Sequence, residues 1–266
     1  LAAVLDGRSA RRAGLLHRLS KGDGAGTLVC FPYAGGNAVN FQPLAQALRE
    51  GGIGVVAVEL PGHDLAADRE PFAPLEQVVD QVVREIAGLS GPVLLWGHSS
   101  GAAFALATAV ALEQRGTPAR RVFLAAQLPG DPAGRLAAAD ELAARDTADI
   151  AAGLAGDRGY PALAELDEQR ADHVGGAYRH DCVSAHRYLA AALADPPAVL
   201  TAPVTVVVAA DDRITAGFAE HHRDWHRLAE RVDLHTLSDG GHYFIRTRPA
   251  ETARVVLRSP RLLTSS

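Results

Sequence analysis

The fold of this chain is decided by the stretch Val93-Leu94-Leu95-Trp96-Gly97-His98-Ser99-Ser100-Gly101-Ala102-Ala103-Phe104. An apolar run ends at Gly97, and a Gly-x-Ser-x-Gly pentapeptide then opens a long segment rich in Ala and Leu. This pattern predicts a strand that turns sharply into a helix and presents Ser99 at the tip of the turn, an arrangement called a nucleophile elbow. Cβ atoms at Gly97 and Gly101 would collide with the neighbouring strand and helix, which explains a glycine at both positions.

Predicted strands and helices alternate on both sides of this stretch. Short apolar runs predict strands over 27–31, 53–58, 92–96, 121–126, 204–208 and 232–237. Helical spacing of apolar residues predicts helices over 41–50, 75–86, 101–115, 216–231 and 249–258. Because the connections are short, the alternation implies right-handed βαβ crossovers. We therefore predict an α/β protein with a mostly parallel central sheet and helices on both faces.

The alternation is interrupted between residues 131 and 197, where no convincing strand is present. Helical pieces there are separated by Gly153, Gly156, Gly159-Tyr160-Pro161 and Gly175-Gly176. We interpret 131–197 as an inserted helical lid. Residues 1–26 end in the flexible stretch Ser20–Gly26, which predicts an N-terminal extension or linker without a stable element. The folded domain is expected over 27–266.

The composition limits the class of protein. The chain has 266 residues, of which 48% are hydrophobic and 21% charged, enough apolar material for one large α/β domain. A formal net charge of -5 argues against a nucleic-acid partner. No apolar run is long enough to span a membrane and no signal-peptide core is present, so we expect a cytoplasmic protein. Cys30 and Cys182 are expected to be core thiols rather than parts of a disulfide or a metal cluster.

An exposed serine is a weak nucleophile and needs a neighbouring base that a third group orients. His242 is the predicted base, because it lies in the Gly-flanked loop 238–244 directly after the last predicted strand. From such a loop a side chain can reach over the carboxyl edge of the sheet. His98 lies beside Ser99, but its side chain must point away from the hydroxyl, so we assign it a packing or positioning role.

The remaining histidines do not predict a metal site. His222 and His226 have the i, i+4 spacing that can bind a metal, but no third ligand is evident. We therefore expect them on a solvated helix face, and we expect the same of His173, His180 and His186. The predicted chemistry requires no cofactor.

The acid that orients the base is expected at the carboxyl end of a strand, because elbows of this type have the chain order Ser, acid, His. Asp211 and Asp212 follow the predicted strand 204–208 closely. We choose Asp212, since the second position has more room to turn back over the sheet edge, and Asp211 remains the alternative. The end of the preceding strand holds Gln127 rather than a carboxylate.

Acyl transfer also needs two backbone N–H groups that stabilise the oxyanion of the tetrahedral intermediate. One is expected from Ser100, the residue after the nucleophile. The other is expected from the loop Pro32-Tyr33-Ala34-Gly35-Gly36 after the first predicted strand, where the glycines let the backbone approach a substrate closely. Ala34 is the preferred donor and Tyr33 the second choice.

Together these motifs resemble the type II thioesterases, a family of α/β-hydrolase thioesterases associated with polyketide and nonribosomal peptide synthases. Phe31-Pro32-Tyr33-Ala34-Gly35-Gly36 resembles the family's Phe-Pro-His/Tyr-Ala-Gly-Gly start, and Gly97-His98-Ser99-Ser100-Gly101 resembles its elbow. Tyr178-Arg179-His180-Asp181 with Tyr188 resembles the end of its lid. Asp212 occupies the place of its catalytic Asp, and Gly241-His242-Tyr243-Phe244 that of its Gly-His-Phe-Phe. The similarity runs from about Thr27 to the C-terminus.

Three positions depart from the family's pattern. Ser100 replaces a common Met, Pro61-Gly62-His63-Asp64 replaces a more usual Pro-Gly-Arg, and Arg213 replaces a frequent Pro. These departures leave the expected triad of Ser99, Asp212 and His242 in place.

The resemblance implies an α/β-hydrolase fold and a serine thioesterase that hydrolyses acyl thioesters through an acyl-Ser99 intermediate. The implied partner is an acyl or peptidyl carrier protein bearing phosphopantetheine, with the lid covering the acyl chain. Three alternatives stay open: an offloading enzyme that releases a cyclic product, a general carboxylesterase, and a hydrolase-fold binding module with an unused triad.

Overall fold

Strand β4 (Val93–His98) lies at the centre of a seven-stranded sheet in this computed structural model. The structure describes residues 14–64, 70–157, 159–160, 163–197 and 199–258. The sheet has the order β1-β3-β2-β4-β5-β6-β7, and every neighbouring pair is parallel except the antiparallel pair of β1 and β3. The other strands are β1 (Leu16–Ser20), β2 (Gly26–Phe31), β3 (Ile53–Val58), β5 (Arg121–Ala125), β6 (Val204–Ala209) and β7 (Val232–Leu237). The predicted mostly parallel sheet is confirmed.

Strand β1 is an element that the sequence does not predict. It pairs with β3 at the edge of the sheet, with Leu16 opposite Val58, although the pattern indicates no stable element before Thr27. Its exposed residues are polar, so the strand carries little apolar signal. The Glu85 carboxylate fixes its start by accepting the N–H groups of Leu15 and Leu16 at 2.8 and 2.9 Å. Residues 1–13 of the expected extension lie outside the described residues.

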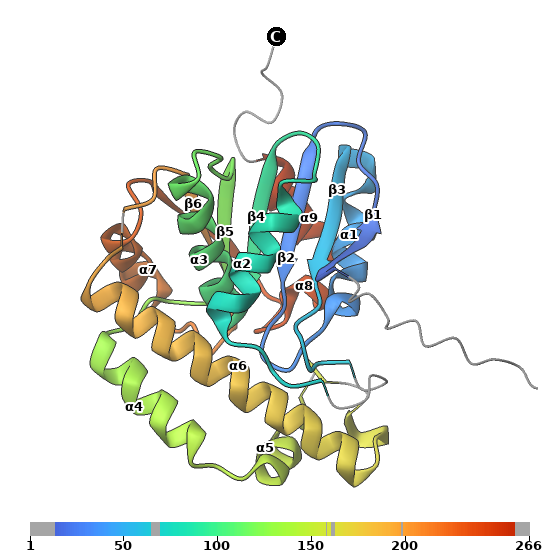
Figure 1. Cartoon of the computed structure of the whole chain (residues 1–266), viewed down its shortest axis with the longest axis vertical. Coiled ribbons are helices and arrows are strands. Elements are labelled where there is room, and N and C mark those ends of the chain that lie inside the picture. The colour runs from blue at the N-terminus through green and yellow to red at the C-terminus, as the bar shows by residue number, and fades with distance from the viewer. Residues whose placement is uncertain (1–13, 65–69, 158, 161–162, 198, 259–266) are drawn as a thin grey trace, which may run out of the picture.

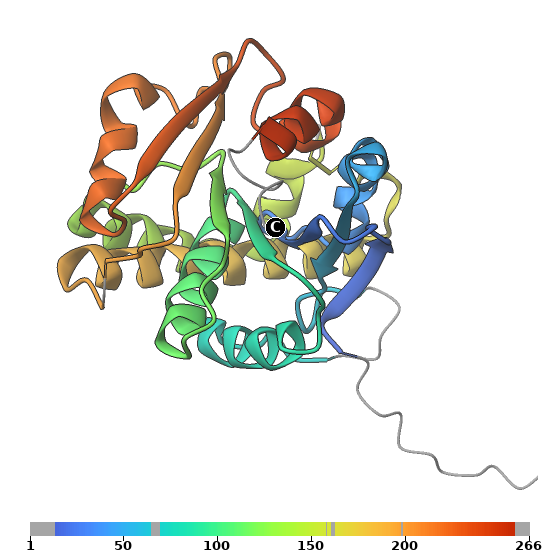
Figure 2. The same ribbon diagram turned by 90° about the horizontal axis from the view of Figure 1, so that it is seen from above.

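Helices cover both faces of the sheet (Figure 2). Helices α2 (Leu75–Ile86) and α3 (Gly101–Gln114) lie on one face, and α1 (Gln42–Ala47), α8 (Phe244–Thr247) and α9 (Pro249–Arg258) lie on the other. The buried apolar side chains accordingly form two clusters, one on each face. Helix α3 is buried over most of its length because its Ala and Gly residues let it pack closely against the sheet, α2 and the lid.

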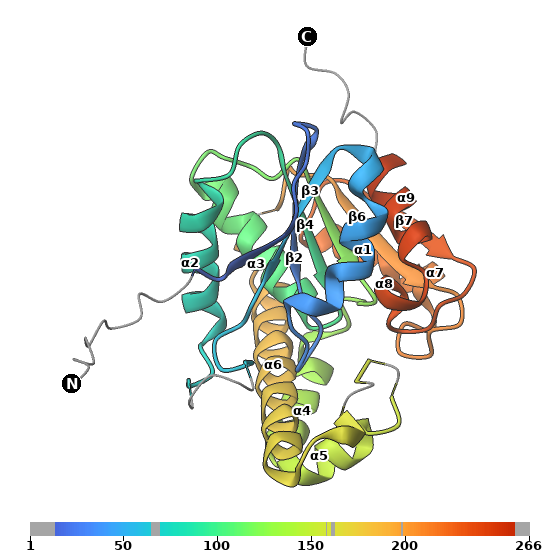
Figure 3. The ribbon, with the colours of Figure 1, turned by 90° about the vertical axis from the view of Figure 1, so that its right-hand side faces the viewer.

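The predicted lid consists of helices α4 (Pro132–Ala143), α5 (Thr147–Leu154) and α6 (Glu168–Ala194), with a short 3-10 turn at Leu163–Glu165. The described part of 131–197 contains no strand. Figures 1 and 3 show α6 crossing beyond the carboxyl ends of the parallel strands, with α4 and α5 packed against its outer side. Within the described parts of the chain, no helix is both long enough and apolar enough to cross a membrane.

Helix α6 is continuous, although the sequence predicts a break at Gly175-Gly176. A Cβ atom on Gly175 would lie 2.1 Å from the Thr147 carbonyl oxygen at the start of α5. The glycine therefore serves a close approach of two helices rather than a helix end.

In the segment after β6, a helix that the sequence predicts as continuous is divided. The helix expected over 216–231 is divided into α7 (Phe218–His221) and a 3-10 helix, His222–Arg227. Gly217, with a φ of 79°, delays the start of α7, and the chain tightens where Trp225 is buried. The short helix α8 directly after the His242 loop is also absent from the predicted elements.

Candidate active site

The turn between β4 and α3 has the geometry of a nucleophile elbow. Ser99 has a φ of 53°, in the left-handed region that non-glycine residues rarely adopt, and its N–H donates to the Ala125 carbonyl at 2.8 Å. A Cβ atom on Gly97 would lie 2.3 Å from the Gly101 carbonyl oxygen, and one on Gly101 would lie 2.4 Å from the Phe31 carbonyl oxygen. The steric reason predicted for both glycines is therefore observed.

The Ser99 hydroxyl takes part in a hydrogen-bonded chain across the carboxyl edge of the sheet. His242, in the loop between β7 and α8, lies with Nε2 2.9 Å from Ser99 Oγ and with Nδ1 2.9 Å from Asp212 Oδ2. In the neutral ring with its hydrogen on Nδ1, Nδ1–H donates to the carboxylate and Nε2 accepts from the hydroxyl. This is the geometry in which an imidazole can remove a proton from serine.

The Asp212 side chain is held as a carboxylate. It is only 5% exposed and also accepts hydrogen bonds from the Ile214 N–H and the Thr215 hydroxyl, both at 2.9 Å. Burial by itself raises the pKa of Asp212, but the hydrogen bond and electrostatic interaction with His242, with these two donors, outweigh burial and lower the pKa below its ordinary value. Asp212 therefore stays ionised where it faces His242.

Asp211, the alternative acid, has a different position. Its exposed carboxylate accepts the N–H groups of Gly240 and Gly241 at 3.3 and 2.8 Å. It thus supports the backbone just before His242, whereas Asp212 contacts the His242 ring.

His98 supports the same loop from the elbow. Its side chain is fully buried, and Nε2–H donates to the His242 carbonyl oxygen at 2.7 Å. Burial and the neighbouring His242 lower the pKa of His98 to about 3, so the ring is neutral at physiological pH. Its ring also packs against those of Tyr33 and Phe244. A packing or positioning role agrees with this geometry.

A cavity of about 350 Å³ opens beside Ser99. Ala34 and Ser100, the expected oxyanion-hole residues, line it together with Tyr33 and His242. Within the described residues, the backbone N–H groups of Ala34, Tyr33 and Ser100 donate to no acceptor. These N–H groups are therefore available to a bound oxyanion.

The lid supplies cavity residues that the sequence does not predict. Arg135 donates through Nε to the Pro129 carbonyl at 2.9 Å and through a terminal nitrogen to His186 Nδ1 at 3.1 Å. Burial and the Arg135 charge lower the pKa of His186 to about 4. Cys182, expected in the core, is only partly buried and lines the cavity, and burial raises the pKa of its thiol to about 12.

The prediction that His173, His180 and His186 lie on a solvated helix face is wrong. All three are half-buried, because α6 crosses the sheet edge and packs on both sides. His173 Nε2 lies 2.6 Å from the Gly62 carbonyl oxygen, and His180 Nδ1 lies 3.3 Å from the Asp181 carboxylate. Helical spacing cannot reveal this, since it ignores which loops approach the helix.

The two histidines of the other pair have different surroundings. His222 Nδ1 lies 2.9 Å from the Phe218 carbonyl oxygen, and His226 is exposed. Across the described ranges, no three His, Cys, Asp or Glu side chains are gathered as a metal ion would require.

A mostly parallel sheet with helices on both faces, a nucleophile elbow and a lid across the carboxyl edge define an α/β-hydrolase. This chain belongs to the thioesterase domain family, which matches residues 26–259. The match confirms the thioesterase family that the motifs indicate. Among curated relatives, the probable cadicidin biosynthesis thioesterase of Streptomyces griseus is 32% identical over 221 residues, which cover 82% of this chain. Thioesterase TesA of Mycobacterium marinum is 33% identical over 108 residues, 38% of this chain. The chain spans 58% and 42% of the length of these two relatives.

Solved structures agree with the fold. The thioesterase RedJ from the prodiginine biosynthetic pathway of Streptomyces coelicolor is 25% identical, with a TM-score of 0.68 over 88% of this chain and 89% of its own. YbtT, a type II thioesterase from the yersiniabactin NRPS/PKS pathway, is 23% identical, with a TM-score of 0.70 over 94% of this chain and 100% of its own.

Proposed function

We propose that this chain is a serine thioesterase that hydrolyses acyl groups from phosphopantetheinyl carrier proteins in polyketide or nonribosomal peptide biosynthesis, in editing or release. The observation that carries the proposal is the hydrogen-bonded chain from Asp212 through His242 to Ser99, at a cavity covered by the lid. Membership of the thioesterase domain family supports the choice of a thioester over other acyl donors.

In the first half of the proposed reaction, Ser99 Oγ attacks the thioester carbonyl carbon while His242 Nε2 takes the hydroxyl proton. Asp212 orients the ring and stabilises the imidazolium that forms. The oxyanion of the tetrahedral intermediate is placed against the N–H groups of Ala34 and Ser100, with Tyr33 as the alternative to Ala34. Collapse breaks the C–S bond, and His242 returns the proton to the leaving thiolate, which gives an acyl-Ser99 ester and a free thiol.

In the second half, water attacks the ester carbonyl carbon while His242 removes a proton from the water. Collapse of this second intermediate breaks the bond to Ser99 Oγ, which regains its proton from His242. The products are a carboxylic acid and the free enzyme. None of these steps uses a cofactor.

An acyl or peptidyl carrier protein is the proposed partner, because its phosphopantetheine thiol is the acyl donor that the family resemblance implies. We place the acyl chain in the cavity under the lid of 131–197. The proposed domain covers 27–266, with β1 completing its sheet from the preceding extension.

Replacement of the nucleophile tests the proposal. Ser99→Ala should lower the hydrolysis of an acyl-pantetheine thioester and of an acylated carrier protein by several orders of magnitude, because the variant cannot form the acyl-enzyme. Free thiol and free acid are measured by mass spectrometry, with circular dichroism as the folding control. Equal rates in both proteins would contradict the mechanism.

The product separates the remaining alternatives. Release of a ring instead of an acid would indicate an offloading cyclase. Faster turnover of simple esters than of carrier thioesters would indicate a carboxylesterase. Failure of a fluorophosphonate to label Ser99 would indicate a binding module.

A further inference from the structure

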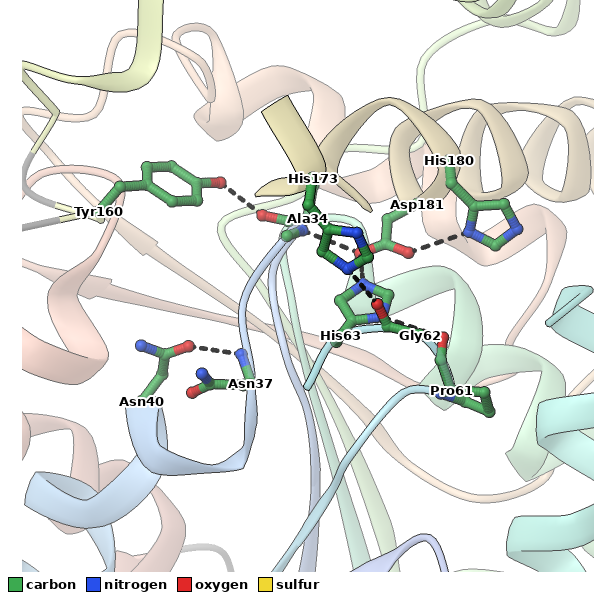
Figure 4. A network of polar contacts seen from close by, with 11 residues as sticks. Ala34, Asn37, Asn40, Pro61, Gly62, His63, Tyr160, His173, His180 and Asp181 are labelled. Carbon is green, nitrogen blue, oxygen red and sulfur yellow. Dashed lines mark hydrogen bonds and ion pairs between the residues drawn. The ribbon is translucent and has the colours of Figure 1, made fainter. Parts of the chain in front are cut away.

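A buried carboxylate outside the proposed triad lies on the lid helix. Asp181 is 1% exposed, yet its Oδ2 accepts the Gly35 N–H at 2.9 Å and lies 2.8 Å from His63 Nε2. Its Oδ1 lies 3.3 Å from His180 Nδ1 on the same helix (Figure 4). A buried carboxylate is costly unless donors satisfy it, and here the donors come from two loops as well as from the helix.

His63 and Asp181 form an ion pair that joins the loop after β3 to α6. Burial by itself lowers the pKa of His63, but the Asp181 carboxylate outweighs burial and raises the pKa above its ordinary value. Burial likewise raises the pKa of Asp181, but the charge of His63 and the donors around the carboxylate lower it. The titratable groups that face this pair are Glu59, whose charge acts on His63, and His180, which contacts Asp181.

Both ends of one peptide unit in the candidate oxyanion loop are held by lid residues. The Ala34 carbonyl accepts a hydrogen bond from the Tyr160 hydroxyl, and the Gly35 N–H of the same peptide unit donates to Asp181. A trans peptide is planar with its C=O and N–H on opposite sides, so two such contacts fix the orientation of the plane. Gly35 has a φ of 63°, and a Cβ there would lie 3.3 Å from the Val174 carbonyl oxygen, so α6 packs directly on this turn.

We propose that Asp181 is a positioning residue that, from the lid helix and with His63 as its ion-pair partner, holds the Ala34–Gly35 peptide. This fixes Ala34, so that its own N–H group, which belongs to the preceding Tyr33–Ala34 peptide, faces the cavity. The inference rests on the proposed thioesterase function and adds that the oxyanion hole is completed by the lid rather than by the sheet alone. Because the N–H groups of such a hole must be aimed at the oxyanion, loss of the Asp181 contact should weaken binding of the tetrahedral intermediate more than binding of the substrate.

The test compares the KM for an acyl-pantetheine thioester with the inhibition constant of a pantetheine thioether trifluoromethyl ketone. Ser99 Oγ adds to the ketone carbon and His242 takes the proton, so the anionic hemiketal occupies the oxyanion hole. Asp181→Ala should raise the inhibition constant and lower kcat by about 10-fold or more, while KM changes by less than about 3-fold. Asp181→Asn keeps an acceptor for the Gly35 N–H. Its inhibition constant and its kcat should therefore lie between those of the wild type and those of the Ala variant.

The matched control breaks a different contact between lid and core. His173→Phe removes the hydrogen bond from α6 to the Gly62 carbonyl but leaves the Gly35 contact in place. We expect a ratio of inhibition constant to KM within about 3-fold of the wild type. An equal rise in this ratio for His173→Phe and Asp181→Ala would overturn the inference, since both would then act only by loosening the lid.

If Asp181→Ala does not fold, Asp181→Asn decides the question by the same ratio, and an unchanged ratio overturns the inference. A wild-type enzyme that neither hydrolyses the thioester nor reacts with the ketone would instead overturn the proposed function, and this inference with it. An active wild type with an unaltered Asp181→Ala variant leaves the thioesterase proposal intact and removes only the role of Asp181.

Discussion

Asp212 decides which nitrogen of His242 carries the hydrogen. Its carboxylate can only accept, so it holds the ring with hydrogen on Nδ1 and leaves Nε2 to accept from Ser99. An amide at position 212 could donate to Nδ1 and reverse this arrangement. Asp212→Asn should therefore lower kcat by about 10⁴-fold, as loss of the correct tautomer does in serine hydrolases, with little change in folding. Single-turnover release of free thiol is the measurement.

Asp211→Asn is the matched comparison, because the two carboxylates are adjacent in the chain but contact different groups. Asp211 accepts the backbone N–H groups of Gly240 and Gly241, and an amide oxygen can replace part of this contact. We expect its kcat to fall by less than about 10-fold. If Asp211→Asn lost as much activity as Asp212→Asn, Asp212 would not be the orienting acid.

The residues that the sequence predicts share one property. Ser99, Asp212 and His242 each lie in a turn at the carboxyl end of a parallel strand, so local pattern and strand order are sufficient to bring them together. His63 and Asp181 are 118 residues apart, and their contact depends on where the lid helix crosses the sheet edge. No local sequence pattern predicts this contact. The Pro-Gly-His sequence in place of Pro-Gly-Arg indicates only that position 63 departs from the family's pattern.

The lid helix α6 contains adjacent glycines in different surroundings. A Cβ on Gly175 would lie 2.1 Å from the Thr147 carbonyl oxygen, whereas one on Gly176 would make only ordinary contacts, the nearest at 3.6 Å with Phe72. Gly175→Ala forces α5 and α6 apart and should lower the free energy of unfolding by about 1–3 kcal/mol. Urea unfolding followed by circular dichroism measures the change.

Gly176→Ala tests whether this cost comes from contact or from helix propensity. Alanine is favoured over glycine in a helix interior, so this variant should raise the free energy of unfolding by up to about 1 kcal/mol. Destabilisation of similar size in both variants would mean that the close approach of α5 and α6 is not the reason for Gly175.

The sequence predicts a strand or helix where its side chains are buried on all sides or along one regular stripe. Strands β2 to β6 are apolar runs buried on both faces, and α2 has one apolar stripe, so each is evident in the sequence. Strand β1 is an edge strand with polar exposed residues, so its sequence does not predict a strand. The Gly175-Gly176 pair has the sequence pattern of a helix end, although α6 continues through it. Both differences arise from tertiary contacts that replace local preference.

At the scale of the whole molecule, two buried histidines, His63 and His98, affect the free energy of unfolding in opposite ways as the pH changes. The pKa of His63 is raised by Asp181 despite burial, so its contribution is present below the ordinary value of about 6.5 and is lost as pH rises through the folded pKa. The pKa of Asp181 is lowered, so its contribution is present above about 3.9 and is lost as pH falls through the folded pKa. The ion pair is therefore most stabilising between about pH 4 and pH 6.5.

His98 acts in the opposite direction. Burial and His242 lower its pKa to about 3, so the folded protein excludes a proton that the unfolded chain binds near pH 6.5. The stability that the neutral ring contributes is present above about pH 6.5 and is lost as pH falls, by about 2 kcal/mol between pH 6.5 and pH 5.

The variant His98→Gln cannot titrate, and its amide can still donate to the His242 carbonyl. Urea unfolding at pH 7 and pH 5 should therefore show that the variant loses less free energy of unfolding than the wild type, by about this amount. The exposed His226→Gln variant should keep the wild-type pH dependence. A His98→Gln variant that loses as much stability as the wild type would show that His98 is not held neutral behind the proposed catalytic histidine.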